Sequence, residues 1–241
     1  MRICDAHAHL GPSGPWQPYA DPSITTGQLI KLLNRNNIER AIVFPNPNVG
    51  DEYPRMNDYI AQSVTRYPDR IVGFGRVDPR RSDAMKELDR IKNKLRLTGL
   101  KLHPFVECFR PDHHFFGKFF RKADELSLPI LFHTGDGFSS PGLIAKIANK
   151  YPKQTMILGH LREGCLGVMR ECQNVYVETS GTLPDLIELA ADIDENRILF
   201  GSDVPYYRYA TQLAIVEAAN ISQKAKTKTL HNNFSRLFNR K

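Results

Sequence analysis

The sequence lacks the features of secreted, disulfide-bonded and membrane-spanning proteins. Its 241 residues include only four cysteines, none of them in a C-x-x-C pair, which indicates reduced thiols rather than a disulfide framework. No apolar run is long enough to cross a bilayer, and the first residues lack the pattern of a secretory leader. We therefore expect a cytoplasmic protein that has no membrane partner.

The chain also lacks a linker, a low-complexity tract or an internal break in composition. A length of 241 residues suits one large core, and α/β barrels often use this length as a single domain. We therefore predict one domain that covers residues 1–241.

The formal net charge of +7 lies almost entirely at the C-terminus. Residues 222–241 contain six basic residues and no acidic residue, so the rest of the chain is close to neutral (+7 − 6 = +1). A solvated basic end helix explains such a run more often than an anionic partner does. We therefore expect a small-molecule substrate rather than nucleic acid.

Short apolar or β-branched segments alternate with segments of helical spacing. The predicted strands are residues 3–7, 40–44, 71–77, 99–102, 129–133, 155–158, 174–177 and 197–200, and helical segments include 26–36, 53–67, 81–94, 116–125, 142–151 and 184–191. Eight strands alternating with helices predict an α/β fold, the (β/α)8 TIM barrel. The alternative, an open doubly wound sheet, is disfavoured because no G-x-G-x-x-G turn follows the first strand.

Polar residues stand where many of these strands end, which is where a barrel of this kind builds its active site. They are His7, His9, Lys101, His103, His133, His160, Glu178, Ser180 and Asp203, and they include five of the eight histidines. Because strand side chains alternate between faces, we predict that Asp5, His7 and His9 point the same way. Two imidazoles on one face can close on one metal ion.

Five motifs in this order resemble those of the amidohydrolase superfamily. They are D-A-H-A-H at 5–9, G-L-K-L-H-P at 99–104, H-T-G at 133–135, G-H at 159–160 and G-S-D-V-P at 201–205. They most resemble the branch of amidohydrolase-related metal-dependent hydrolases, which also includes decarboxylases of the aminocarboxymuconate semialdehyde type. N-F-S-R-L-F at 233–238 is similar to that branch's C-terminal N-x-x-R-L-F pattern. The resemblance therefore covers nearly the whole chain.

The resemblance implies a mononuclear metal site with His7, His9, His133 and Asp203 as ligands. Three imidazoles and one carboxylate suit Zn²⁺, our first candidate, although imidazole also accepts iron, cobalt or manganese. Coordination lowers the pKa of water to roughly 7 and so supplies hydroxide at neutral pH. Asp203 is then expected to accept the proton of the water, and His160 to orient the water or stabilise the oxyanion.

Four further residues are expected to contact substrate, namely Lys101, His103, Trp16 and Arg162. Lys101 is open to two interpretations: it supports the site or holds a substrate carboxylate, or it forms the bridging carbamate of a two-metal enzyme; one metal is the default. His103 is more readily a packed residue than a ligand. Trp16 can pack on a substrate ring or anchor its loop, and Arg162 can pair with an anion or stand exposed at a helix start.

The resulting hypothesis is a metal-dependent hydrolase that cleaves an amide, cyclic amide, ester or lactone bond in a small molecule. A decarboxylase of a small carboxylic acid is the alternative, because the same metal shell can serve both reactions. A metal-dependent DNase is less expected, because those enzymes usually carry a glutamate where this chain has Lys101 to His103. The substrate and the oligomeric state are left open, although barrels often form homo-oligomers through exposed helices.

Overall fold

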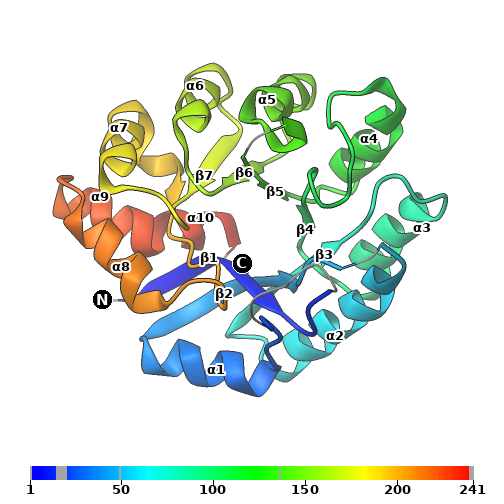
Figure 1. Ribbon diagram of the computed structural model, residues 1–241, viewed down its shortest axis with the longest axis horizontal. Coiled ribbons are helices and arrows are strands. Elements are labelled where there is room, and N and C mark those ends of the chain that lie inside the picture. The colour runs from blue at the N-terminus through cyan, green and yellow to red at the C-terminus, as the bar shows by residue number, and fades with distance from the viewer. Residues whose placement is uncertain (1, 15–20, 49, 136, 239–241) are drawn as a thin grey trace.

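The computed structural model describes residues 2–14, 21–48, 50–135 and 137–238, and it confirms the predicted (β/α)8 barrel. Eight parallel strands pair in the order of the sequence, with helices around them (Figure 1). The strands are β1 (Ile3–Leu10), β2 (Ile38–Pro45), β3 (Ile71–Arg76), β4 (Gly99–Leu102), β5 (Ile130–His133), β6 (Met156–Gly159), β7 (Val175–Glu178) and β8 (Ile198–Leu199).

The ring closes between β1 and the segment that follows the short β8. The backbone N–H of Asp203 donates to the carbonyl of His7 at 2.7 Å, and that of His9 donates to the carbonyl of Val204 at 2.8 Å. These hydrogen bonds bring the end of the eighth strand against the two histidines of the first. Closure of the barrel therefore assembles residues that are almost two hundred positions apart.

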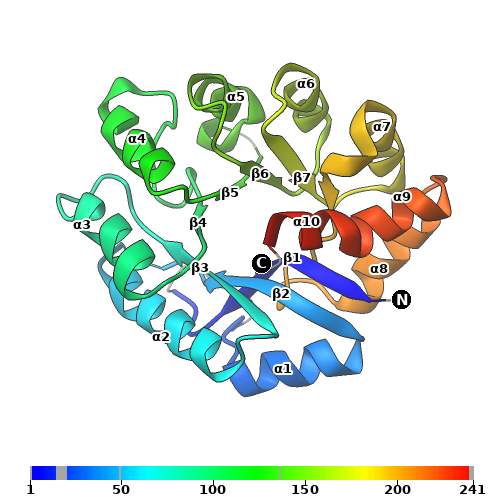
Figure 2. The same cartoon turned by 180° about the vertical axis from the view of Figure 1, so that it is seen from behind.

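The helices surround the strands, and the last of them lies across one end of the barrel (Figure 1 and Figure 2). They are α1 (Thr26–Arg35), α2 (Tyr53–Arg66), α3 (Ala84–Asp89), α4 (Gly117–Glu125), α5 (Pro141–Lys150), α6 (Glu163–Glu171), α7 (Pro184–Asp194), α8 (Tyr209–Ala218), α9 (Gln223–Thr227) and α10 (Asn233–Phe238). One buried apolar cluster joins Val43, Leu102 and Leu158 of the strands to Leu29 and Ile60 of the helices. No helix in the described ranges is both long and apolar enough to cross a bilayer.

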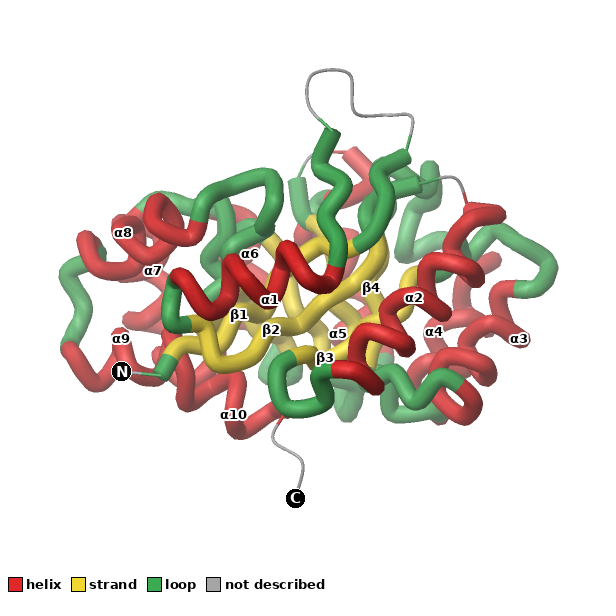
Figure 3. The backbone as a smooth tube through the Cα atoms, turned by 90° about the horizontal axis from the view of Figure 1, so that it is seen from below, coloured by secondary structure: helices red, strands yellow, loops and turns green. Residues whose placement is uncertain are grey.

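A second apolar cluster joins strand residues, including Phe44, Leu131 and Ile157, to Phe234 of α10. Seen from behind, α10 crosses close to the middle of the strand ring (Figure 2). Figure 3 shows α10 below the strands, and it shows loops that rise above the opposite end of the barrel, called the tall loops below. One end of the barrel is therefore covered by the C-terminal helix, and the strand-end side chains gather at the other.

The described part of the basic C-terminal segment, residues 222–238, packs against the rest of the fold. Nζ of Lys228 lies 2.5 Å from Oε1 of Glu195 and 2.7 Å from Oδ1 of Asn196. The guanidinium of Arg236 donates to the carbonyl of Asn196, and Lys226 is buried. These contacts hold the segment next to the start of β8.

Candidate metal centre

The first strand is irregular, and this corrects one prediction. Its register with β2 shifts between Asp5 and Ala8. An extra residue in a strand reverses the facing of the side chains beyond it. Asp5 therefore does not share a side with His7 and His9; its carboxylate accepts hydrogen bonds from the hydroxyls of Ser202 at 2.6 Å and Tyr209 at 2.7 Å. Asp5 ties β1 to the segment after β8 and to α8.

His7 and His9 converge on Asp203. Their Nε2 atoms lie 3.1 Å and 3.0 Å from the same carboxylate oxygen, Oδ1 of Asp203. All three side chains are buried. That oxygen makes no well-directed hydrogen bond with any described residue, although a buried polar atom without one is costly. A cation shared by the two imidazoles and the carboxylate would remove this cost, so the donor set fits the expected metal ion.

His160 lies within the same group of donors. Ligand atoms of His7, His160 and Asp203 all lie within 4.8 Å of one another. Nε2 of His160 is also 3.0 Å from Nδ1 of His133, whose ring stacks on that of His103 with centroids 3.7 Å apart. The structure thus brings together the four predicted ligands and His160, while the division of roles among them stays a prediction.

Two of these residues have strained backbones. His160 has a φ of 62° and Asp203 a φ of 56°, in the left-handed region that side chains other than glycine seldom adopt. Such strain is tolerated where the surrounding structure determines it, often at functional sites. At Asp203 the hydrogen bond of its N–H to the carbonyl of His7 helps to hold this backbone.

Glu178 takes a larger part than the sequence indicates. It is fully buried at the end of β7, and its Oε1 lies 2.8 Å from Nδ1 of His7. The same oxygen accepts from the backbone N–H of His160 at 2.6 Å and from the hydroxyl of Ser180 at 2.8 Å. A carboxylate at Nδ1 fixes the proton on that nitrogen and turns the Nε2 lone pair to the metal side.

The space for Glu178 depends on a glycine. A Cβ built on Gly201 would overlap Oε2 of Glu178. The sequence places Glu178 at a strand end, but the sequence does not show that it reaches His7 or that Gly201 makes room for it. Glu178 and Gly201 therefore form one unit with His7, brought together only by closure of the barrel.

Burial keeps most of the imidazoles neutral. It lowers the pKa of His9 to about 3 and that of His160 to about 4, and it also lowers the pKa of His133. For Asp203, burial is outweighed by the neighbouring His7 and His9, which hold the pKa of the carboxyl well below its usual range. His9, His133 and His160 are therefore neutral imidazoles and Asp203 is an anion, the protonation states that metal binding requires.

His7 differs from the other imidazoles. Burial and Lys101 oppose its protonation, but Glu178 and Asp203 outweigh them and raise the pKa of His7. In turn, His7 overcomes the effect of burial on Glu178 and lowers the pKa of that carboxyl to about 2. The His7 imidazole thus lies between two carboxylates.

Lys101 reaches the same space from β4. Its buried Nζ lies 3.4 Å from Nε2 of His7 and 4.8 Å from the ring centroid of Phe44. Burial lowers the pKa of this ammonium to about 7, against the pull of Asp203. A lysine of this kind can exchange its proton near neutral pH.

A cavity of about 580 Å³ opens over the centre. Its walls include the expected substrate contacts Lys101, His103 and Arg162, whereas Trp16 lies outside the described residues. Four aromatic side chains not singled out in the sequence also line it: Phe105, Phe138, Tyr206 and Tyr207. The sequence could have indicated these four residues, because each of them shortly follows β4, β5 or β8.

The family model described as Amidohydrolase matches residues 4–240, nearly the whole chain. The chain belongs to this amidohydrolase family. Gamma-resorcylate decarboxylase of Rhodococcus jostii (strain RHA1) is 20% identical to this amidohydrolase-family protein, over 87% of this chain and 86% of the relative. The superfamily resemblance carried by the five strand-end motifs is thereby confirmed.

Solved structures with the same fold include two decarboxylases. The 5-carboxyvanillate decarboxylase of Sphingomonas paucimobilis has a TM-score of 0.82 and 16% identity over 98% of each chain. The dihydroxybenzoic acid decarboxylase of Polaromonas sp. JS666, whose structure holds manganese and the inhibitor 2-nitroresorcinol, has a TM-score of 0.81 and 19% identity over 99% of this chain and 98% of that chain. At these identities the likeness shows a common barrel fold.

Proposed function

We propose that this amidohydrolase-family protein is a metal-dependent decarboxylase of a small aromatic carboxylic acid. The observation that carries the proposal is the make-up of the cavity: aromatic side chains line its wall, and His9, His133 and Asp203 line it together with the buried Lys101. An apolar ring suits the aromatic wall, and a carboxylate suits the cationic floor. The relatives named above, which are decarboxylases of aromatic acids, also favour this alternative over hydrolysis.

The metal ion would be held by His7, His9, His133 and Asp203. When bound, it would act as a Lewis acid that orients the substrate oxygens and stabilises developing negative charge. Imidazole and carboxylate donors accept Zn²⁺ and Mn²⁺ alike. Our first candidate, Zn²⁺, therefore stands beside Mn²⁺, and metal analysis must decide between them.

The protein's own residues would then position the acid and move one proton. Lys101 would pair with the substrate carboxylate beside His7, and the ring would lie against Phe138 and Tyr207. Replacement of the carboxylate by hydrogen requires a proton at the ring carbon, and the carboxylate leaves as CO₂. Asp203, an anion at rest, would take up a proton from a phenolic hydroxyl of the substrate and deliver it to the ring carbon as the C–C bond breaks.

The basic C-terminal segment gives the nuclease alternative no support. Lys228 and Arg236 contact Glu195 and Asn196 of the barrel itself. Arg236 belongs to α10, which lies on the other side of the strands from the tall loops (Figure 3). We therefore assign Lys228 and Arg236 to the structure of the barrel.

The test is product analysis of the enzyme reconstituted with Mn²⁺ or Zn²⁺. Hydroxybenzoic acids, N-acyl compounds and lactones would be offered in parallel and the products identified by mass spectrometry. We expect loss of CO₂ from an aromatic acid, dependent on metal and abolished by His7→Ala and by Asp203→Asn, but not by Glu125→Gln on the exposed end of α4. Addition of water to a lactone or amide, without loss of CO₂ from any acid, would instead establish the hydrolase hypothesis.

A further inference from the structure

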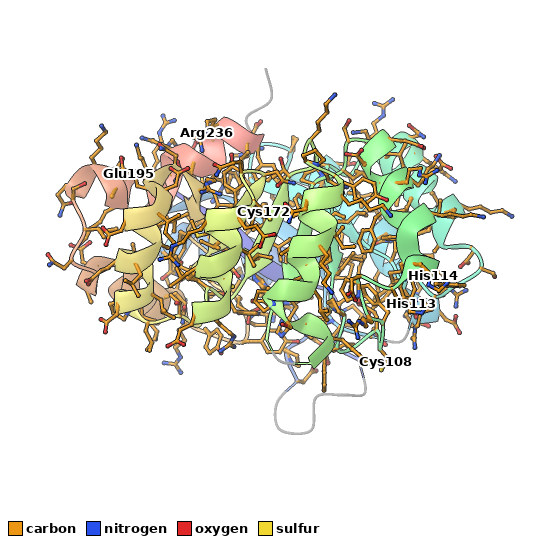
Figure 4. All side chains as sticks on the ribbon, turned by 90° about the horizontal axis from the view of Figure 1, so that it is seen from above. Cys108, His113, His114, Cys172, Glu195 and Arg236 are labelled. Carbon is orange, nitrogen blue, oxygen red and sulfur yellow. The ribbon has the colours of Figure 1, made fainter. Side chains whose placement is uncertain are left out.

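A second group of metal-ligating side chains lies away from the cavity. Cys4 of β1, Glu39 of β2 and His231 each place one potential ligand atom within 4.8 Å of the others. His231 belongs to the π-helical segment Lys228–Asn232, which leads directly into α10. Figure 4 shows Arg236 of α10 and the cavity-lining Cys108 at opposite ends of the molecule.

Two backbone irregularities bring these side chains together. Ile3 pairs with Ile38 and Cys4 with Arg40, so Glu39 is an extra residue in β2. A bulge of this kind redirects a side chain that a regular strand would point elsewhere. His231 stands in a π-helical turn, a rare local insertion in helices.

The carboxylate of Glu39 has an unsatisfied oxygen. Its Oε2 is buried, has no hydrogen-bond partner within the described ranges, and lies 3.7 Å from Nε2 of His231. The other oxygen, Oε1, lies 3.5 Å from the exposed guanidinium of Arg2. A cation at Oε2 would remove the cost of the unsatisfied atom and could displace Arg2 into water.

The contact of Nδ1 of His231 favours the tautomer that leaves Nε2 for a metal ion. Its Nδ1 lies 3.0 Å from Oδ1 of Asn232, an acceptor only, so the proton belongs on Nδ1. Nε2 then carries a lone pair, which accepts a hydrogen bond from the hydroxyl of Ser235 at 3.3 Å. The hydroxyl can turn to water when Nε2 binds a cation.

The third donor is the thiol of Cys4. It is buried, and burial together with Glu39 raises its pKa to about 12, while the nearby Arg40 opposes this. Without metal the group is therefore a neutral thiol. On coordination the S–H bond breaks, the proton passes to solvent, and the sulfur binds as a thiolate.

We propose that Cys4, Glu39 and His231 bind one Zn²⁺ ion, which ties the segment that carries His231 to β1 and β2. One thiolate, one carboxylate and one imidazole are all ligands that Zn²⁺ accepts, and water completes a tetrahedral shell. The two anionic ligands balance the charge of the ion, next to Arg2 and Arg40. His231 and Glu39 are partly exposed, which gives the ion a path from solvent.

The test uses Co²⁺, because sulfur ligation gives a thiolate-to-cobalt charge-transfer band in the near ultraviolet. The proposed ligands at the cavity contain only nitrogen and oxygen, so they give no such band, and Cys108→Ser tests for a contribution of the exposed thiol that lines the cavity. Full-length protein would be stripped with chelator and titrated with Co²⁺. We expect the band to saturate and then to disappear when Zn²⁺ is added.

The variants assign the band. We expect Cys4→Ser to abolish it and His231→Ala to weaken Co²⁺ binding at least about tenfold, whereas Cys108→Ser and His7→Ala leave it in place. If Cys4→Ser does not fold, Glu39→Gln and His231→Asn replace it, and Zn²⁺ should raise the melting temperature of the wild type more than that of either variant. No band in the wild type, or a band that survives in Cys4→Ser or in His231→Ala at unchanged affinity, overturns the proposal.

Discussion

Nδ1 of His7 lies 2.8 Å from Oε1 of Glu178, and both side chains are buried. The other ring nitrogen, Nε2, lies 3.1 Å from Oδ1 of Asp203. The contact with Glu178 therefore determines the role of Nε2: when the proton of a neutral His7 is held on Nδ1, Nε2 carries a lone pair that faces Asp203. His7 and Glu178 are 171 positions apart in the sequence.

Glu178→Gln should weaken metal binding without unfolding the protein. The amide keeps the size of the side chain but loses the charge that holds the proton on Nδ1 of His7. We expect metal affinity to fall roughly 10–100-fold, measured by calorimetric titration of the stripped protein with Mn²⁺. Glu125→Gln serves as the exposed control, and equal affinities in wild type and Glu178→Gln would show that Glu178 has no part in metal binding.

Gly201→Ala should disturb the same unit by volume alone. Its Cβ would overlap Oε2 of Glu178, and overpacking of this kind costs about 1–3 kcal/mol. Gly167→Ala, in the middle of α6 where a Cβ meets open space, should instead stabilise the protein by roughly 0.5–1 kcal/mol. Urea denaturation of both variants compares the two effects. If Gly201→Ala left the free energy of unfolding and the metal content unchanged, Glu178 would have to move aside without cost.

Lys101→Met should lower affinity for the acid while leaving the metal in place. Loss of a charged hydrogen bond to a substrate carboxylate costs about 1.5–3 kcal/mol, which corresponds to a rise in KM of roughly 10–100-fold. Kinetic measurements on the acid identified by product analysis give the change in KM, and replacement of the exposed Lys118 of α4 by Met is the control. A loss of metal content with unchanged KM would assign Lys101 to the metal centre instead.

The ion pair of Asp194 and Arg197 should make stability depend on pH. Burial favours the neutral acid, but the hydrogen bonds from Asn196 and Arg197 outweigh it and lower the pKa of Asp194. A lowered carboxyl pKa adds stability above the unfolded-state pKa, near about pH 4, and this stability is lost as pH falls through the folded-state value.

Asp194→Asn should therefore destabilise the protein by about 1 kcal/mol at neutral pH. The difference from wild type should shrink as the pH of the urea titrations is lowered from about 7 toward about 3. Asp192→Asn, an exposed neighbour, provides the comparison. A difference that stays constant with pH would show that the charge of Asp194 contributes nothing.

Much of the barrel could be predicted because its strands are buried on both sides and read as short apolar runs. The predicted strands 99–102 and 129–133 correspond closely to β4 and β5. The predicted strand 197–200 is shorter in the structure, where only Ile198–Leu199 pairs as β8. There the chain turns from pairing with β7 to isolated hydrogen bonds with β1, and no local pattern encodes that change.

The sequence by itself placed His7, His9, His133, His160 and Asp203 within or shortly after short strand segments, where a barrel builds its site. Tertiary structure decided what these side chains touch. The bulge in β1 separates Asp5, which contacts Ser202, from the side of the strand that carries His7 and His9. Closure of the ring brings Glu178 to His7, and the absence of a side chain at Gly201 provides the space for Glu178. Alternation along a strand follows from local covalent geometry, whereas contacts between strands far apart in the chain exist only once the ring has closed.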